Sequence, residues 1–357
     1  MGVEEFSKQQ EEQVDFFDSL PDAIVLEIFN RVEDAKSLSA CTLLCKRFGD
    51  LVTQTRNVSL EITRPTALYE KTHVSKSKGF FGRYILNPIH EFLHRIVSRK
   101  SKTCSNCCDD DGEDSTFKLP NELLKNFKEI QSLSVKLPGH HGDISSENAL
   151  QQSSQPNCSG ALLKWKAEFG KELESCVILG ATGFKKSEPK PKKEGDMPIS
   201  CNLTNKQLKK RVVWTISCLI ASSARHHMLK QIISLNRMIR DVKISDGSKQ
   251  GTIKMTERQV VELRNEMSSN ADIVELERTK VPAVTIKMWY MPMLELPECG
   301  AVMRGATLAV IRPTEAAAGK DDDLSLAMGA FGEKCMVEAV RKLIEKKKSY
   351  TLEMNSF

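Results

Sequence analysis

The stretch Leu20-Pro21-Asp22-Ala23-Ile24-Val25-Leu26-Glu27-Ile28-Phe29, followed by Leu38-Ser39-Ala40-Cys41-Thr42-Leu43-Leu44-Cys45-Lys46-Arg47-Phe48, decides the fold of the N-terminal part of this 357-residue chain. Both runs place apolar side chains at the spacing of a helix and keep charged side chains between them. We therefore expect two short amphipathic helices here.

The first helix is predicted to begin at Pro21, because a fixed φ and a missing N–H suit the first helical position. Asp22 then lies in the first turn, where the positive end of the helix dipole stabilises a carboxylate. Ile24, Ile28 and Val32 recur every four residues and define the apolar side of this helix.

Asp34 is the expected N-cap of the second helix. A unit of about 45 residues this apolar has too little core of its own, so part of its surface needs a partner or the rest of the chain. One interpretation is a buried helical hairpin at the start of a larger domain. The other is a docking module.

The residue identities favour the docking module. The Leu-Pro opening, the Ile-Phe pair, the acidic residue before the second helix and the Cys-Lys-Arg-Phe close resemble an F-box, with Ile24 in place of the commoner Leu and Phe48 in place of the commoner Trp. The resemblance implies a three-helix unit that binds a Skp-type adaptor and, through it, a cullin, a RING subunit and a ubiquitin-conjugating enzyme. The residues implied to form or support this surface are Leu20, Pro21, Ile24, Ile28, Phe29, Val32, Leu38, Cys41, Leu44, Cys45 and Phe48, with Lys46 and Arg47 at its rim.

Composition sets limits on the rest of the chain. Hydrophobic residues make up 40% and charged residues 28%, as in a globular protein, and the longest near-apolar run, residues 212–221, is too short to cross a bilayer. The acidic N-terminus lacks the features of a signal peptide, so we expect the protein in the nucleus or the cytoplasm, with its cysteines reduced. A net charge of +5 is too modest to predict direct nucleic-acid binding.

One cysteine cluster has metal-ligand spacing. Cys104, Cys107 and Cys108 follow His90 and His94, so a zinc site can be drawn, but the polar surroundings make it a weak candidate. The chain contains no serine-nucleophile elbow, phosphate-binding glycine loop or dinucleotide fingerprint. His90-Glu91-Phe92-Leu93-His94 has the His-Glu-x-x-His spacing of a zinc-protease helix. We predict no cofactor, no metal and no catalytic residue. A hydrolase or metalloenzyme in the C-terminal part is the minor alternative.

Polar and Pro- or Gly-rich breaks divide the chain into five parts. We expect a flexible tail at residues 1–14, the F-box at 15–60, a connector with a short helix and a polar Cys/Asp loop at 61–116, an irregular α/β recognition domain at 117–312, and a linker with a C-terminal helix at 313–357. One break carries a basic stretch that resembles a nuclear-import signal, although a solvated loop explains it as well. Its lysines are Lys185, Lys186, Lys190, Lys192 and Lys193.

A loose repeat runs through the recognition domain. Residues 130–135, 173–178, 239–244 and 281–286 share an apolar-x-x-apolar-x-apolar frame, with a shorter copy at 308–310, and most copies follow helix-like sequence such as residues 123–127 and 162–166. Helix then strand, repeated, predicts a leucine-rich-repeat-like α/β fold with a mainly parallel, curved sheet. An ordinary α/β domain with similar buried strands is the alternative.

The segment 205–235 is apolar at helical spacing and basic near its start. It could be a basic amphipathic helix for a membrane or a nucleic acid. The favoured reading is two core helices that break near Ser222 and Ser223, with the basic residues in water.

Residues 162–170, 175–180 and 211–217 resemble a small group of plant F-box proteins, the auxin up-regulated F-box proteins and their relatives, over most of the chain. The resemblance implies a non-catalytic adaptor of a ubiquitin ligase complex that recruits a protein substrate for ubiquitination and degradation, and it allows a role in hormone-linked signalling. The alternative is an F-box scaffold or nuclear interaction module outside a cullin ligase.

Overall fold

The computed structural model describes residues 16–62, 124–138, 160–186, 203–269, 278–316, 320–346 and 348–357. The predicted tail, most of the predicted connector and the cysteine cluster at 104–108 lie outside these ranges. Within them, no helix is both long enough and apolar enough to cross a membrane.

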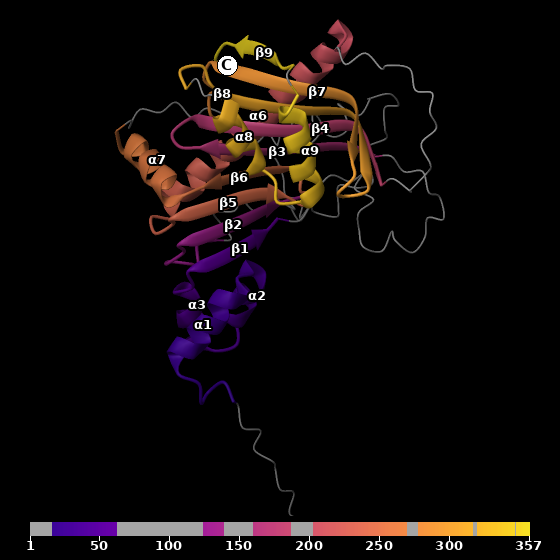
Figure 1. The fold of residues 1–357 in the computed structure, drawn as a ribbon. Coiled ribbons are helices and arrows are strands. Elements are labelled where there is room, and N and C mark those ends of the chain that lie inside the picture. The colour runs from indigo at the N-terminus through magenta and orange to yellow at the C-terminus, as the bar shows by residue number, and fades with distance from the viewer. Residues whose placement is uncertain are drawn as a thin grey trace, which may run out of the picture.

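Three short helices form the N-terminal unit, at the lower end of the view in Figure 1. They are α1 (Asp22–Val32), α2 (Ala35–Cys41) and α3 (Lys46–Thr53). Pro21 occupies the cap position, so α1 begins one residue later than expected. Strand β1 (Asn57–Glu61) follows α3 directly and is the first strand of the sheet.

The body is built on one nine-stranded sheet with the order β1-β2-β5-β6-β3-β4-β8-β7-β9. The remaining strands are β2 (Ser132–Leu137), β3 (Gly160–Phe169), β4 (Leu173–Lys186), β5 (Asp241–Asp246), β6 (Gly251–Met255), β7 (Val284–Leu296), β8 (Ala301–Pro313) and β9 (Tyr350–Met354). The β1/β2, β2/β5 and β3/β6 pairs are parallel, and the other pairs are antiparallel.

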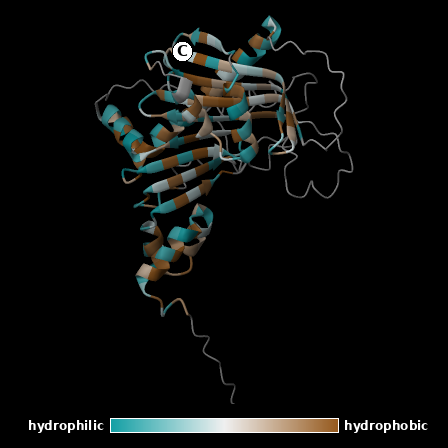
Figure 2. Cartoon of the chain, viewed as in Figure 1, coloured by the Kyte–Doolittle hydropathy of each residue, from teal (hydrophilic) through white to brown (hydrophobic). Residues whose placement is uncertain are grey.

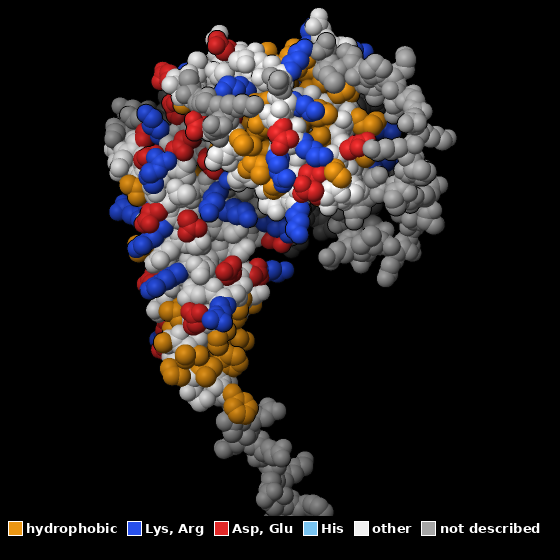
Figure 3. Space-filling model, viewed as in Figure 1, with side chains coloured by type: hydrophobic (Ala, Val, Ile, Leu, Met, Phe, Trp, Pro, Cys, Tyr) orange, Lys and Arg blue, Asp and Glu red, His pale blue; other side chains and the backbone are white. Residues whose placement is uncertain are grey.

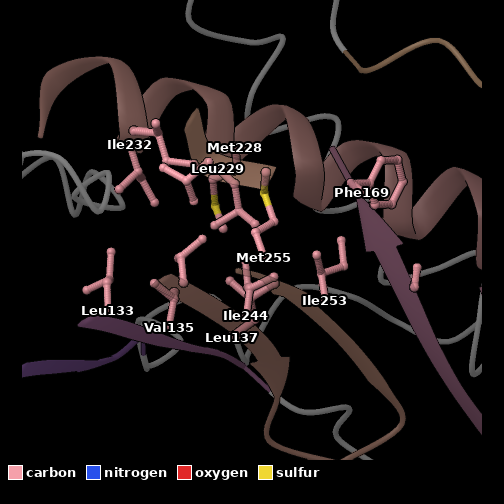
Figure 4. Close-up of a cluster of buried hydrophobic side chains, with 14 of the residues drawn as sticks. Leu133, Val135, Leu137, Phe169, Met228, Leu229, Ile232, Ile244, Ile253 and Met255 are labelled. Carbon is pink, nitrogen blue, oxygen red and sulfur yellow. The ribbon is translucent and has the colours of Figure 1, made fainter. Parts of the chain in front are cut away.

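One face of the sheet is covered by α6 (Asn205–Leu235), with α7 (Glu257–Ser269) beside it. Figure 4 shows side chains of β2, β5 and β6 pointing toward α6, where Met228, Leu229 and Ile232 meet them. A capping box at Thr204 and Gln207 starts α6, since the Thr204 hydroxyl accepts from the Gln207 N–H and the Gln207 side chain accepts from the Thr204 N–H.

In the part of the chain that the structure describes, the opposite face is covered only in part. Helices α8 (Lys320–Met328) and α9 (Lys334–Ile344) pack over β4, β7 and β8, on the near side in Figure 1. Alternate side chains of β4 enter two different hydrophobic clusters, one on each face of the sheet. Cys176 and Ile178 pack in the cluster beneath α6, and Val177 and Leu179 pack in the cluster beneath α9.

The structure corrects three expectations. The sheet is mostly antiparallel rather than mainly parallel, so a leucine-rich-repeat-like arrangement is not supported. Residues 162–166, expected as helix, belong to β3, where apolar and polar side chains alternate inward and outward. Residues 205–235 form one helix that continues through Ser222 and Ser223, because both serines are buried with satisfied hydroxyls: Ser222 donates to the Leu219 carbonyl within α6 and Ser223 to the Thr279 carbonyl outside it.

The repeated apolar frames do mark strands. They overlap the starts of β2, β4, β5 and β7 and part of β8. The C-terminal helix predicted around residues 339–344 is α9, and β9 beyond it adds the last strand of the sheet.

Candidate functional site on the N-terminal helices

Seven large apolar side chains are exposed on the N-terminal unit. Ile24, Ile28 and Val32 lie along one side of α1 and are 48%, 36% and 43% exposed. Leu43 and Leu44, between α2 and α3, are 86% and 71% exposed, and Phe16 and Phe17 precede α1. We call these seven side chains the N-terminal apolar patch. Figure 3 shows hydrophobic side chains gathered at this end of the molecule.

A second apolar stripe of α1 points inward. Val25 and Phe29 are buried one residue after Ile24 and Ile28, so α1 is apolar on two sides. Phe29 packs edge-on against Phe48 of α3, with ring centroids 5.5 Å apart. These buried side chains belong to the same hydrophobic cluster as the sheet beneath α6, and that cluster leaves the patch uncovered.

Arg47 fixes the start of α1. Its Nε donates to an Asp22 carboxylate oxygen at 2.8 Å, and its two Nη groups donate to the carbonyls of Phe17 and Leu20. One planar guanidinium thus holds the chain before α1 and the first turn of the helix. Phe17 also lies edge-on to Phe48, with centroids 6.0 Å apart.

Asp34 caps α2 as the sequence predicts, but the second predicted helix, expected to carry Leu38 through Phe48, is divided into α2 and α3. The Asp34 carboxylate accepts from the Ser37 N–H at 2.8 Å and from its hydroxyl at 2.6 Å, and these bonds hold the pKa of Asp34 below its usual value. The Cys45 sulfur accepts from the Phe48 N–H at 3.4 Å at the start of α3.

Hydrogen bonds join the unit to the sheet. The Asn30 side-chain oxygen accepts from the N–H groups of Arg56 and Asn57, at 2.7 and 3.3 Å. The Glu33 carbonyl accepts from the Ser59 N–H at 2.6 Å, which covers part of the outer edge of β1. The three helices and the sheet therefore meet through backbone bonding rather than through a separate linker.

The predicted adaptor-binding residues fall into three groups by burial. Exposed are Pro21, Ile24, Ile28, Val32, Leu44, Cys45 and Lys46; partly buried are Leu20, Cys41, Arg47 and Phe48; buried are Phe29 and Leu38. The first group can touch a partner, and the buried pair can only support the surface from inside.

Phe16, Phe17 and Leu43 of the N-terminal apolar patch are not among the residues predicted from the sequence. These side chains lie outside the helical repeat, so periodicity gave no signal for them. Their signal is composition alone: large apolar residues next to Asp18, Ser19 and other polar neighbours.

The other predicted sites lie mostly outside the described residues. Cys104, Cys107 and Cys108 are in this category, as are Lys190, Lys192 and Lys193. Lys185 and Lys186 belong to strand β4 rather than to a linker. In the described ranges, no three His, Cys, Asp or Glu side chains are grouped so as to hold a metal ion.

Comparison with known proteins agrees with this architecture. No protein-family model and no solved structure matches the chain. Among Arabidopsis thaliana proteins, it is 36% identical to F-box protein At4g18380 over 97% of this chain and 95% of that protein. It is 35% identical to F-box protein AUF2 and 33% identical to F-box protein AUF1, each over 96% of this chain and 100% of the relative. The chain therefore belongs to the plant F-box protein family that includes the auxin up-regulated F-box proteins.

Proposed function

We propose that this protein is the substrate-recognition subunit of a Skp–cullin–F-box ubiquitin ligase and acts in the nucleus or cytoplasm. The observation that carries the proposal is the N-terminal apolar patch on a folded three-helix unit. A Skp-type adaptor would cover this patch, and the cullin and RING subunits would follow through the adaptor.

The size of the patch supports a docking role. Single exposed aliphatic side chains are ordinary on a protein surface, whereas a contiguous group of them marks an interface. Full burial of one Ile or Leu side chain contributes about 1.5 to 3 kcal/mol, so even partial burial of seven such groups supplies several kcal/mol of binding energy. Arg47, which holds Phe17 and Leu20 in place, keeps part of this surface ordered before the partner arrives.

Such a subunit needs no catalytic side chain. Holding an acceptor lysine of a bound substrate near a charged ubiquitin makes the transfer effectively unimolecular. The sheet body would hold the substrate, and the ubiquitinated product would pass to the proteasome. A link to hormone signalling rests on the resemblance to the auxin up-regulated relatives alone.

The test is capture of the adaptor by the double variant Ile24→Ser/Ile28→Ser. Both side chains are exposed, so the substitution removes apolar contact area and leaves the core of the unit intact. Co-purification of a Skp-type protein should fall at least about tenfold, because roughly 1.4 kcal/mol is a factor of ten in affinity. The matched control is Val213→Ser/Val261→Ser, which changes two exposed apolar residues on α6 and α7.

Undiminished adaptor capture by the Ile24/Ile28 variant would contradict the docking assignment. Cullin co-purification separates the two classes of F-box function. Adaptor capture without any cullin in the complex would favour a scaffold or nuclear interaction module that works outside a ligase.

A further inference from the structure

The half of the sheet next to the N-terminal unit has one face that no described helix covers. In β2, β5, β6 and β3, every second side chain points into the core beneath α6. Figure 2 shows the resulting alternation of hydrophobic and hydrophilic residues along these strands. The outward residues form what we call the lysine face: Lys136, Lys166, Lys243 and Lys254, with Ser59, Ser134, Ser245 and Thr252.

Strand register arranges these residues in two rows. Ser59, Ser134, Lys243, Lys254 and Glu168 stand side by side across five neighbouring strands. The next row is Glu61, Lys136, Ser245, Thr252 and Lys166. The two rows therefore hold four lysines and four hydroxyl groups, and their two carboxylates lie at opposite edges. A third carboxylate on this face, Asp241, precedes Lys243 by two residues in β5 and accepts from the Ser132 hydroxyl at 2.9 Å.

Lys243 and Lys254 are directly opposite each other on antiparallel strands, and both are exposed. Like charges at such a position destabilise a sheet, because the two side chains lie only about 5 Å apart at their Cβ atoms. Lys136 pairs with Glu61 at 2.8 Å and Lys166 pairs with Glu168 at 3.0 Å. Neither Lys243 nor Lys254 forms an ion pair with a carboxylate of the described residues.

The lysine face has a definite boundary at β3. Lys164 binds Glu333 at 2.6 Å, and Lys166 donates to the Gly329 carbonyl at 3.3 Å, so the α8–α9 connection borders the face there. The opposite border is β1 and the N-terminal unit. Five strands span about 19 Å, which an extended peptide of roughly six residues covers.

We propose that the lysine face binds an acidic peptide segment, rich in Asp and Glu, of the protein that this F-box subunit recruits; this rests on the proposed function. Charge complementarity is the argument: two lysines without a described carboxylate partner supply ammonium donors, and the serine and threonine hydroxyls beside them donate to carboxylates. The outward residues of the two rows include no aromatic side chain, which a single-stranded nucleic acid would use for stacking.

The test measures fluorescence anisotropy of a labelled Glu/Ser peptide of about eight residues with the purified full-length protein. Binding should weaken as salt rises, because exposed charges are screened. The variant Lys243→Thr/Lys254→Thr should bind the peptide roughly five- to tenfold more weakly, as expected for two exposed charge contacts. Its thermal midpoint should be no lower than that of the parent, since the like-charge pair is gone.

The matched control is Lys209→Thr/Lys210→Thr, which makes the same change of charge on the exposed start of α6. It should bind the peptide within about twofold of the parent, and a Gln/Ser peptide should not bind either protein. Adaptor capture, measured on the same preparations, should be unchanged by Lys243→Thr/Lys254→Thr. Adaptor capture therefore tests the F-box assignment separately, so a negative peptide-binding result would contradict only the proposal for the lysine face.

Three results would overturn the proposal. Equal peptide binding by the parent and the Lys243/Lys254 variant would remove these lysines from recognition. Tighter binding of a single-stranded oligonucleotide, lost in the same variant, would make the face a nucleic-acid surface. The third result is peptide binding that is seen only after the acidic residues of 109–114 are neutralised. It would mean that the lysine face binds this acidic segment of the same chain.

Discussion

The guanidinium of Arg47 lies 2.8 Å from the carboxylate of Asp22, 25 residues earlier in the chain, and ties α3 to the start of α1. The carboxylate is well exposed, so the ion pair itself contributes little. The bonds to the carbonyls of Phe17 and Leu20 matter more, because they hold the chain before α1 against α3.

Replacing Arg47 with Ala should destabilise the N-terminal unit by about 1 to 2 kcal/mol, close to one hydrogen bond to a charged group, because its three contacts are exposed or only partly buried. Hydrogen exchange of α1 amides should accelerate, and adaptor capture should weaken with it. Arg31→Ala is the control, because the Arg31–Glu27 pair is a highly exposed contact within α1. Equal exchange in the two variants would show that Arg47 does not hold the helix start.

His226 should make the body sensitive to mild acid. It is fully buried in α6, stacks on Phe169 with ring centroids 4.3 Å apart, and has Thr279 Oγ1 2.8 Å from Nδ1 and the Gly170 carbonyl 3.2 Å from Nε2. Burial, with help from the nearby charge of Lys230, lowers the pKa of His226 from 6.5 to about 3. The folded state therefore keeps this ring neutral.

Below about pH 6.5 the unfolded chain takes up a proton at His226 and the folded chain does not, so stability falls as pH falls. Between about pH 6 and 4 the slope should approach 1.4 kcal/mol per pH unit from this group alone. Urea unfolding of the parent and of His226→Gln across this range measures it. The variant should be less stable at pH 7 and should lack this slope; parallel curves would contradict the assignment.

Gly251 allows a close contact that Ala cannot. A Cβ there would overlap the Trp165 ring and lie 2.5 Å from Nη1 of Arg225. Arg225 lies over that ring, 4.6 Å from its centroid, and pairs with the buried Asp246 at 2.7 Å. Gly251→Ala should therefore disturb both contacts.

The expected loss for Gly251→Ala is about 1 to 3 kcal/mol, the usual cost of forcing extra atoms into a packed site. Gly160→Ala is the matched control, because no atom lies within 4 Å of a Cβ at that position. Denaturant unfolding of both variants gives the comparison. A smaller loss for Gly251→Ala than for Gly160→Ala would show that the contact relaxes freely.

Cys299 should react slowly with alkylating reagents although it is partly exposed. The Cys335 thiol and the Glu338 carboxylate raise the pKa of Cys299 to about 12, with Cys335 the larger cause, so little thiolate is present at neutral pH. Glu338 is a buried residue of α9 that packs against the turn between β7 and β8, where its carboxylate accepts from the Glu298 N–H at 3.2 Å.

Glu338→Gln should speed iodoacetamide modification of Cys299 at pH 7.5 several-fold, because a neutral amide no longer opposes the thiolate. Mass spectrometry of the Cys299 peptide gives the rate, and the exposed Cys45 provides an internal reference. An unchanged ratio of the two rates would exclude the carboxylate as the cause.

Much of the N-terminal unit could be predicted from sequence, because local signals agree there. Asp34 is the cap that its residue type suggests, and Ile24, Ile28 and Val32 share one side of α1. Periodicity alone could not tell which of the two apolar stripes faces a partner. Val25 and Phe29 face inward because α3 and β1 pack against that side of α1, which the sequence of α1 does not show.

The sheet was predictable in part. The repeated frames marked strands, but an inward–outward alternation looks the same in parallel and antiparallel sheets, so strand direction was not readable. Trp165 lies in a strand although its neighbours Lys164 and Lys166 suggested a helix, because tertiary pairing with β4 and β6 overrides local propensity. The lysine face likewise depends on register, which brings Lys243 and Lys254 together only in the folded chain.

The bonds from Asn30 and Glu33 to β1 have a consequence for how a target would be processed. The N-terminal helices are hydrogen-bonded to the start of the sheet, so in the proposed complex the sheet would set the orientation of a bound target toward the ligase. For a subunit of the proposed kind, only acceptor lysines that project from the bound target in one direction would be modified. Selectivity among the lysines of a target would then be a property of geometry, separate from affinity.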